Sequence, residues 1–126
     1  MGEVAQAVRT VVVLADDLIW ATRLSDAITA AGARPRRARR LVDLVALTGP
    51  AGDGIGFVIV DLTARAYDGV EAIRVSKGAG ARVVAVGQHD DAALRKTALA
   101  AGAERVFTYR ALFEDGPRTL AAWLAR

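Results

Sequence analysis

The sequence predicts one α/β domain, in which a parallel sheet of five strands carries helices on both faces. Strand-like and helix-like segments alternate five times along the chain. The strand-like runs are rich in valine and almost continuously apolar, as strands that are buried on both faces are. The 126 residues contain no repeat, linker or low-complexity tract that would separate a second domain. Residues 1–126 are therefore expected to form one domain of three layers, α/β/α.

The first strand and the first helix have the clearest patterns. RTVVVLAD at 9–16 is a continuous β-branched run that predicts a buried strand. LIWATRLSDAITAAG at 18–32 predicts a helix, and Gly32 is a natural left-handed stop for it. The apolar residues of this helix recur on one face: Ala21, Leu24, Ile28 and Ala31.

The second strand-like segment, residues 33–40, is weaker because it contains Pro35. Proline cannot donate a hydrogen bond to a neighbouring strand, so the strand is expected at an edge of the sheet. A short helix at 40–47 follows, and its buried face is expected to consist of Leu41, Leu44 and Val45.

The remaining segments complete the alternation. Strands are expected at 55–61, 81–87 and 104–109, with helices at 69–77 and 90–102 and a last helix from Gly116 and Pro117. Together with an edge position for the second strand, this pattern predicts the strand order 2-1-3-4-5. That order is the flavodoxin-like, doubly wound arrangement.

Composition excludes several classes of protein. A hydrophobic fraction of 53% excludes a disordered chain, and no apolar run approaches the ~20 residues of a membrane span. The chain has no cysteine, so disulfides and thiolate metal sites are excluded. Its first ten residues do not form a signal peptide. A cytoplasmic location is expected.

Three aspartates are expected to meet at one edge of the sheet. Asp16 and Asp17 end the first strand, and Asp61 ends the third, which lies beside it in the predicted order. Carboxylates on strands ~5 Å apart repel each other, and Mg²⁺ would relieve the repulsion because it prefers oxygen ligands. The structural alternative is that each aspartate caps a helix or a turn by accepting N–H groups.

Over almost its full length, the chain resembles the receiver domains of two-component response regulators, of the chemotaxis-regulator type. The similar stretches are VLADD at 13–17, VIVD at 58–61, DLTARAYDG at 61–69 and AGAERVF at 101–107. The resemblance implies that Asp61 is a phosphoacceptor, which would take a phosphoryl group from a histidine kinase. It also implies that Asp16, Asp17, Asp61 and the backbone carbonyl of Thr63 hold Mg²⁺.

Five positions depart from the receiver pattern, and two of them are the expected prolines, which are Arg65 and Arg110 here. The small hydroxyl residue after the fourth strand falls on Gly87, the lysine that ends the fifth strand on Tyr109, and the aromatic switch residue on Val106. Gly87 has no side chain to bind phosphoryl oxygens. Tyr109 offers one neutral hydrogen bond where lysine would supply a charge. Val106 cannot swing a polar ring between inside and outside.

Two other residues are candidates for phosphate contacts. Arg110 would replace the missing lysine if the register of the fifth strand shifted by one residue, because a guanidinium group suits phosphate. An alternating strand would otherwise point it to the opposite face. His89 follows the fourth strand and is either near the site or simply solvated.

The prediction for function is an atypical receiver, or pseudo-receiver, that binds another signalling protein, either a histidine kinase or an output protein. Phosphorylation would be weak, absent or uncoupled. The partner would contact Arg95, Lys96, Phe107, Tyr109 and Trp123, although for Trp123 the favoured role is to pack the last helix onto the sheet. A Mg²⁺-dependent regulator phosphorylated on Asp61 is the alternative, and a homodimer stays open. No Ser-His-Asp set or phosphate loop occurs, so no enzyme is expected.

A run of arginines allows a third interpretation. RPRRARR at 34–40 contains Arg34, Arg36, Arg37, Arg39 and Arg40, although the net charge of the chain is only +3. Such a run could bind the phosphates of nucleic acid. It could instead protect an exposed edge strand from aggregation. The absence of interleaved aromatic residues favours edge protection over nucleic-acid binding.

Overall fold

A parallel sheet of five strands forms the centre of the protein in the computed structural model, which describes residues 8–126. The strands are β1 (Thr10–Leu14), β2 (Arg34–Ala38), β3 (Phe57–Asp61), β4 (Arg82–Gly87) and β5 (Val106–Thr108). Their order is β2-β1-β3-β4-β5, and every neighbouring pair is parallel. The predicted fold class and strand order are confirmed.

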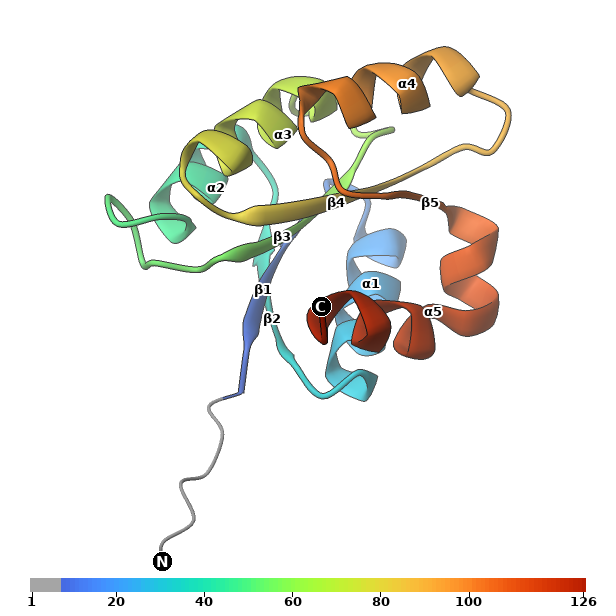
Figure 1. The fold of residues 1–126 in the computed structure, drawn as a ribbon, viewed down its shortest axis with the longest axis horizontal. Helices are drawn as coiled ribbons and strands as arrows, with labels where there is room; N and C mark the ends of the chain where they lie inside the picture. The colour runs from blue at the N-terminus through green and yellow to red at the C-terminus, as the bar shows by residue number, and fades with distance from the viewer. Residues whose placement is uncertain (1–7) are drawn as a thin grey trace, which may run out of the picture.

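Helices cover both faces of the sheet (Figure 1). The helices are α1 (Leu18–Ala30), α2 (Leu41–Leu47), α3 (Gly69–Gly78), α4 (Ala92–Ala101) and α5 (Tyr109–Leu124). Helices α1 and α5 lie on one face, and α2, α3 and α4 lie on the other. None of the helices described within residues 8–126 is long and apolar enough to cross a bilayer.

The alternation of side chains along β1 produces two hydrophobic cores. Val11 and Val13 pack beneath α1 and α5, whereas Val12 and Leu14 pack beneath α2 and α3. All four side chains are completely buried. Burial of each contributes roughly 1.5–3 kcal/mol to folding, which explains why a continuous apolar run is required at the centre of the sheet.

The second strand occupies an edge, as the proline predicts. Pro35 lies beside Val11 of β1, and β2 pairs with no other strand. The missing N–H therefore costs no bond within the interior of the sheet.

Helix α1 buries the predicted face, and α2 differs from the prediction. Leu44 is buried in α2 as expected, but Val45 is exposed and Leu47 is buried in its place. The helix is only seven residues long, so the residues at its two ends decide which face meets the sheet.

The end of the chain also differs from the prediction. Strand β5 has only three residues, and the chain enters α5 at Tyr109 because the Thr108 hydroxyl accepts the Ala111 N–H at 3.0 Å. The helix kinks at Asp115, where φ is −146°, because Pro117 has no N–H to continue the helical ladder. The predicted start at Gly116 and Pro117 is thus the start of the second half of α5.

Candidate functional site

The Asp61 carboxylate lies at the carboxyl end of β3 and is only 1% exposed. Its Oδ1 atom accepts the backbone N–H of Thr63 at 3.1 Å and the Thr63 hydroxyl at 2.9 Å. The same oxygen accepts the hydroxyl of Tyr109. A buried carboxylate is costly unless it is hydrogen bonded, and these donors supply its bonds from within the protein. The bond from the Thr63 N–H is the turn-capping contact of the structural alternative, and the role of Asp61 as a phosphoacceptor stays a prediction.

Tyr109 reaches Asp61 because it is the first residue of α5. The Tyr109 and Thr63 hydroxyls are also within hydrogen-bond contact, so Asp61, Thr63 and Tyr109 form one polar cluster. The Tyr109 ring packs on Trp20 of α1, with ring centroids 4.3 Å apart. Burial and the hydrogen bond to Asp61 raise the pKa of the Tyr109 phenol, which therefore stays protonated as a donor at neutral pH.

The two other aspartates are engaged separately. Asp17 caps α1, because its Oδ1 accepts the N–H groups of Ile19 at 2.8 Å and Trp20 at 3.1 Å. Asp16 turns to the loop after β3 and accepts the N–H groups of Arg65 at 2.8 Å and Ala66 at 2.9 Å.

The pKa of Asp16 follows from these contacts. Partial burial alone would raise the pKa of its carboxyl group, but the backbone hydrogen bonds to the carboxylate outweigh burial and lower it. The charged Asp16 side chain therefore links the end of β1 to the β3–α3 loop through hydrogen bonds.

These contacts do not form the metal site that the sequence suggests. Between residues 8 and 126, no group of three acidic or histidine side chains is placed to hold a metal ion. Asp61 directs one oxygen to Thr63 and Tyr109, and the carboxylates of Asp16 and Asp17 bind backbone amides. Each of these carboxylates thus uses one oxygen for donors within the protein, and the assignment of Asp16, Asp17, Asp61 and Thr63 as Mg²⁺ ligands stays a prediction.

Tyr67 also belongs to this edge of the sheet, and the sequence gives no sign of its role. Its hydroxyl lies 2.8 Å from the Leu14 carbonyl and 2.6 Å from the Asp61 carbonyl, so it bridges the ends of β1 and β3. Burial, followed by the nearby acidic groups of Asp61 and Asp16, raises the pKa of its phenol. Tyr67 therefore stays protonated at neutral pH and holds the ends of β1 and β3 together beside the Asp61 cluster.

Two departures from the receiver pattern are explained by packing. Gly87 ends β4, and a Cβ atom at this position would lie 3.3 Å from Cδ1 of Leu62. A side chain at this position would therefore require Leu62 to shift by a few tenths of an ångström. Val106 is buried against the α3 and α4 layer, where it contributes to the core.

The comparisons with known proteins bear on the fold. No family model matches the chain, and no curated protein matches it. Among solved structures, a putative response regulator from Chloroflexus aurantiacus matches with a TM-score of 0.79 at 17% identity, covering 95% of this chain and 100% of that chain. The chain has the receiver-domain fold.

Two further structures agree with this assignment. The response regulator domain of Thermotoga maritima CheB is 21% identical, with a TM-score of 0.75 over 92% of this chain and 93% of that chain. The beryllofluoride-activated DrrB receiver domain is 19% identical, with a TM-score of 0.78 over 95% of this chain and all of that chain.

Neither candidate for a compensating phosphate contact reaches the Asp61 cluster of this receiver fold. Arg110 lies in a helix rather than a strand, and its Nε donates to Glu114 at 2.9 Å. The proposed register shift is therefore wrong. His89 is exposed in the β4–α4 loop and makes no hydrogen bond within the described part of the chain.

The partner face predicted from the sequence is largely unavailable. Phe107 and Trp123 are buried in the core beneath α1 and α5. The structural alternative for Trp123 is thereby confirmed. Arg95 is exposed but donates to the Val106 carbonyl at 3.1 Å, and Lys96 is exposed. Phe107 and Trp123 are buried because the side chain of Phe107 in β5 points to the sheet face that α5 covers, and Trp123 lies on the side of α5 that meets the sheet.

Three large apolar side chains are exposed near the starts of α1 and α5. Leu18 is 73% exposed, Ile19 is 63% exposed and Phe113 is 67% exposed. Arg23 lies over the rings of both Trp20 and Phe113 and so joins α1 and α5, whereas Leu18 lies near Arg37 and Arg39 on the β2 side of α1. Sequence periodicity could have shown these exposed residues, because they lie off the buried faces of their helices.

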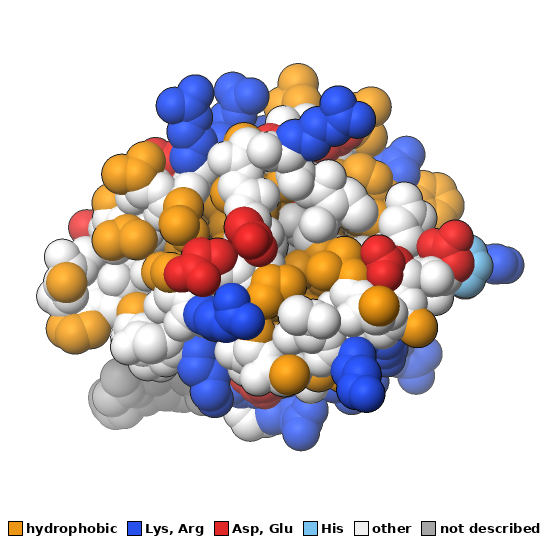
Figure 2. All heavy atoms as spheres, turned by 90° about the horizontal axis from the view of Figure 1, so that it is seen from above, with side chains coloured by type: hydrophobic (Ala, Val, Ile, Leu, Met, Phe, Trp, Pro, Cys, Tyr) orange, Lys and Arg blue, Asp and Glu red, His pale blue; other side chains and the backbone are white. Residues whose placement is uncertain are grey.

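The arginine run lies on the β2 edge and is partly tied to the rest of the protein. Arg37 donates to the hydroxyls of Ser25 and Thr22, each at 3.2 Å, and Arg36 lies 3.9 Å from Asp53. On the face seen in Figure 2, basic side chains of the described residues lie in separate groups, with acidic and apolar side chains between them. These observations agree with edge protection rather than with a continuous phosphate-binding surface.

Proposed function

We propose that this receiver-fold protein is a signalling module that acts by binding another protein, without depending on phosphorylation of Asp61. The observation that carries the proposal is the Asp61 cluster. The carboxylate that would attack a phosphoryl donor is 1% exposed and already accepts two hydroxyl groups. These bonds hold Oδ1, and burial of the residue restricts the access of a phosphodonor to the other carboxylate oxygen.

Two further features, at Gly87 and Tyr109, support this proposal, and the acidic pair is compatible with either outcome. The carboxylates of Asp16 and Asp17 each use one oxygen to accept backbone N–H groups, which fixes their orientation and leaves one oxygen of each for a metal ion. Gly87 supplies no hydroxyl for phosphoryl oxygens, and Leu62 occupies the adjacent space. Tyr109 stands where the resemblance implies a lysine, and it contributes no positive charge to balance a phosphoaspartate.

The partner that we propose is another protein of a two-component pathway, either a histidine kinase or an output protein. The exposed ring of Phe113 is suited to such a contact, because aromatic side chains anchor protein interfaces, and Leu18 and Ile19 are exposed apolar side chains at the start of α1. A second copy of the chain is the other candidate. The module would work in the cytoplasm and would have no enzyme activity of its own.

Incubation with a small phosphodonor tests the proposal directly. The protein is treated with acetyl phosphate in the presence and absence of Mg²⁺, and intact mass is measured over time. We expect no added phosphoryl group. The Asp61→Asn variant is the matched control, because it keeps the size of the side chain and removes the nucleophilic oxygen.

Tryptophan fluorescence provides a second measurement. Trp20 packs on Tyr109 at 4.3 Å, so its emission reports on the Asp61 cluster. We expect little change when Mg²⁺ and beryllofluoride are added. A saturable change that is lost in Asp61→Asn, together with a gain of phosphoryl mass, would favour the alternative of a Mg²⁺-dependent regulator phosphorylated on Asp61.

A further inference from the structure

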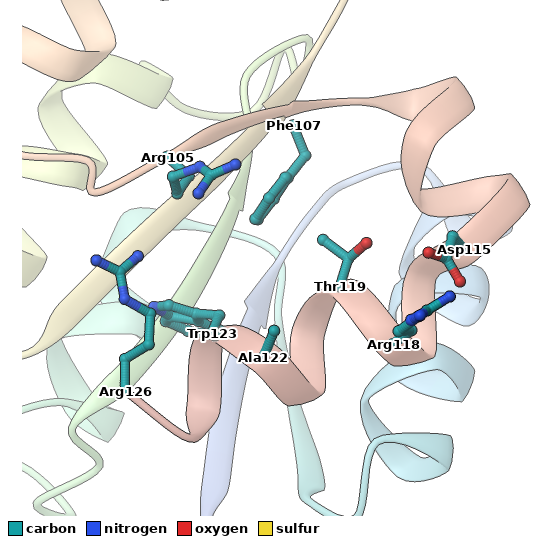
Figure 3. A pocket seen from close by; sticks show the side chains of 8 residues that line it. All are labelled: Arg105, Phe107, Asp115, Arg118, Thr119, Ala122, Trp123 and Arg126. Atoms are coloured by element: carbon teal, nitrogen blue, oxygen red, sulfur yellow. The ribbon is translucent and has the colours of Figure 1, made fainter.

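Helix α5 consists of two arms that meet at Asp115 (Figure 1 and Figure 3). Asp115 has φ −146° and ψ 33°, which lie outside the helical range, and Pro117 has no N–H to continue the helical ladder across the bend. Figure 3 shows Asp115 at the bend and Trp123 on the second arm. We call residues 109–114 the first arm and residues 116–124 the second arm. A break in helical hydrogen bonding allows the backbone angles to change there, so Asp115 is suited to be a hinge.

The two arms are anchored to very different extents. The second arm has four residues buried against the sheet and α1, namely Gly116, Leu120, Trp123 and Leu124. Its end is also tied to β4, because Arg82 donates to the backbone carbonyls of Trp123 at 3.3 Å and Arg126 at 2.9 Å. Within residues 109–114, Leu112 is the one buried side chain. Segments with few buried apolar contacts open at a lower free energy than the core does, so the first arm is the weakly anchored part of α5.

A groove beside the first arm gives it room to move. The groove lies between α1 and α5, has a volume of about 330 Å³, and is lined by Leu24 and Ala27 of α1 and by Leu112, Phe113 and Pro117 of α5. Side chains in a close-packed interior leave few voids of this size. The first arm is therefore packed less tightly on α1 than a core helix would be.

Two sets of contacts hold the first arm in place, one at each end. At its start, the Tyr109 hydroxyl donates to Oδ1 of Asp61, and the Tyr109 ring packs on Trp20 with centroids 4.3 Å apart. Near its end, the guanidinium carbon of Arg23 lies 5.0 Å from the centroid of the Phe113 ring. The same guanidinium carbon lies 5.3 Å from the centroid of the Trp20 ring. Trp20 and Arg23 of α1 therefore contact both ends of the first arm.

The first arm is built to move as one body. Tyr109 and Phe113 are four residues apart, so they lie on the same side of the helix about one turn from each other. Between them, Arg110 donates to Glu114 at 2.9 Å and adds a contact within the arm. A displacement of Tyr109 from Asp61 therefore also displaces Phe113 from Arg23.

We infer that the first arm opens and closes about Asp115 as one hinged body, which couples the Tyr109–Asp61 bond to the exposed ring of Phe113. A protein that holds Phe113 in its closed position stabilises the bond to Asp61, and loss of that bond frees Phe113. The coupling acts equally in both directions, since both contacts belong to the same closed state. The inference adds regulation to the proposed function, and it rests on that function only for the use of Phe113 as a contact.

Amide hydrogen exchange of the full chain tests the hinge, with rates measured by nuclear magnetic resonance at low concentrations of urea. We expect the amides of residues 112–114 to exchange faster than those of residues 120–124 in the wild-type protein. Exchange in the first arm should not depend on urea, because a local opening exposes little surface. Exchange in the second arm should accelerate with urea, because it requires global unfolding.

Variants at the two ends of the first arm test the coupling. Tyr109→Phe should accelerate exchange of residues 112–114 by roughly tenfold, because the closed state loses a hydrogen bond to a charged group. Arg23→Gln should accelerate the same amides by about threefold, because the closed state loses an exposed cation–π contact. Arg118→Gln is the matched control, since it removes an exposed arginine of the second arm that makes no described hydrogen bond or ion pair, and it should leave residues 112–114 unchanged.

Three results would overturn the inference. The first is exchange of residues 112–114 that is as slow and as urea-dependent as that of residues 120–124, which would make α5 a single cooperative unit. The second is an unchanged rate for residues 112–114 in Tyr109→Phe. The third is acceleration in Tyr109→Phe but none in Arg23→Gln, which would show that the two ends are not coupled. These measurements use no partner and no phosphodonor, so either the hinge or the proposed function can fail without the other.

Discussion

Substitution of Tyr109 by phenylalanine tests whether the tyrosine hydroxyl stabilises the buried Asp61 carboxylate. The change removes one oxygen atom and leaves the ring to pack on Trp20, 4.3 Å away. Asp61 keeps the two donors of Thr63, at 2.9 Å and 3.1 Å. Any loss of stability therefore reports on the hydroxyl itself.

The expected loss of stability in Tyr109→Phe follows from the hydrogen bond that Asp61 loses. Hydrogen bonds to charged groups contribute about 1.5–3 kcal/mol to stability. Asp61 is 1% exposed, so water does not readily replace the lost donor. Because Thr63 remains, we expect the lower part of this range, about 1.5–2 kcal/mol. For a domain of this length, that corresponds to a decrease in Tm of roughly 5–10 °C.

Urea unfolding at pH 7, followed by circular dichroism, measures this change. Thr97→Val is the control, because it removes a hydroxyl that donates to the Ala93 carbonyl at an exposed site, and it should cost less than about 0.5 kcal/mol. Tyr109→Phe as stable as the wild-type protein would refute the reasoning. So would simple additivity of Tyr109→Phe and Asp61→Asn in a double-mutant cycle, since contacting residues should be coupled.

Three other substitutions have defined outcomes. Folding lowers the pKa of Asp16 from its usual value of 3.8, so the charged carboxylate stabilises the folded protein above that pH, and this stabilisation is lost as the pH falls through the folded-state pKa. The difference in Tm between the wild-type protein and Asp16→Asn should therefore be largest near pH 6 and shrink below about pH 4. Gly87→Ser should fold with a loss of at most about 1–2 kcal/mol in urea unfolding, because its Cβ would press on Leu62 at 3.3 Å, and it should gain no phosphoryl group from acetyl phosphate. Phe113→Ala should change the free energy of unfolding by less than about 1 kcal/mol, the value of its exposed contact with Arg23, and a larger loss would show that the ring has a structural role.

Much of the fold is readable from local pattern. Strands β1, β3 and β4 are almost continuously apolar. Successive side chains point to opposite faces of the sheet, and helices cover both faces, so both sets of side chains are buried. Pro35 identifies the edge strand because a missing N–H is tolerated only where no second neighbour needs it. These features depend on residues close together in the sequence, so the sequence alone predicts them.

The end of the chain illustrates where local pattern fails. The residues Val106 to Tyr109 have strand propensity throughout, since they are β-branched or aromatic. The Thr108 cap ends the strand one residue early and turns Tyr109 into a helical residue. Strand propensity alone does not predict that the Thr108 hydroxyl caps a helix and so ends the strand.

The candidate site depends on contacts between distant residues. A terminal aspartate of a strand is visible in the sequence, and so is its ability to cap a turn. The donor to Asp61 from Tyr109 is not visible, because it requires the helix to begin at that residue. The binding of Asp16 to the amides of Arg65 and Ala66 likewise depends on the path of a loop about 50 residues away.

The bond between Asp61 and Tyr109 also has a consequence for the order in which the protein is completed. The two residues are 48 positions apart, and the ribosome delivers all of β1 to β4 before Tyr109. Until α5 has emerged, the newborn sheet holds an aspartate that lacks one of its donors. Helix α5 therefore completes the hydrogen bonds of Asp61 as well as the packing of its face of the sheet. A nascent chain gains its full stability only when translation has passed this tyrosine.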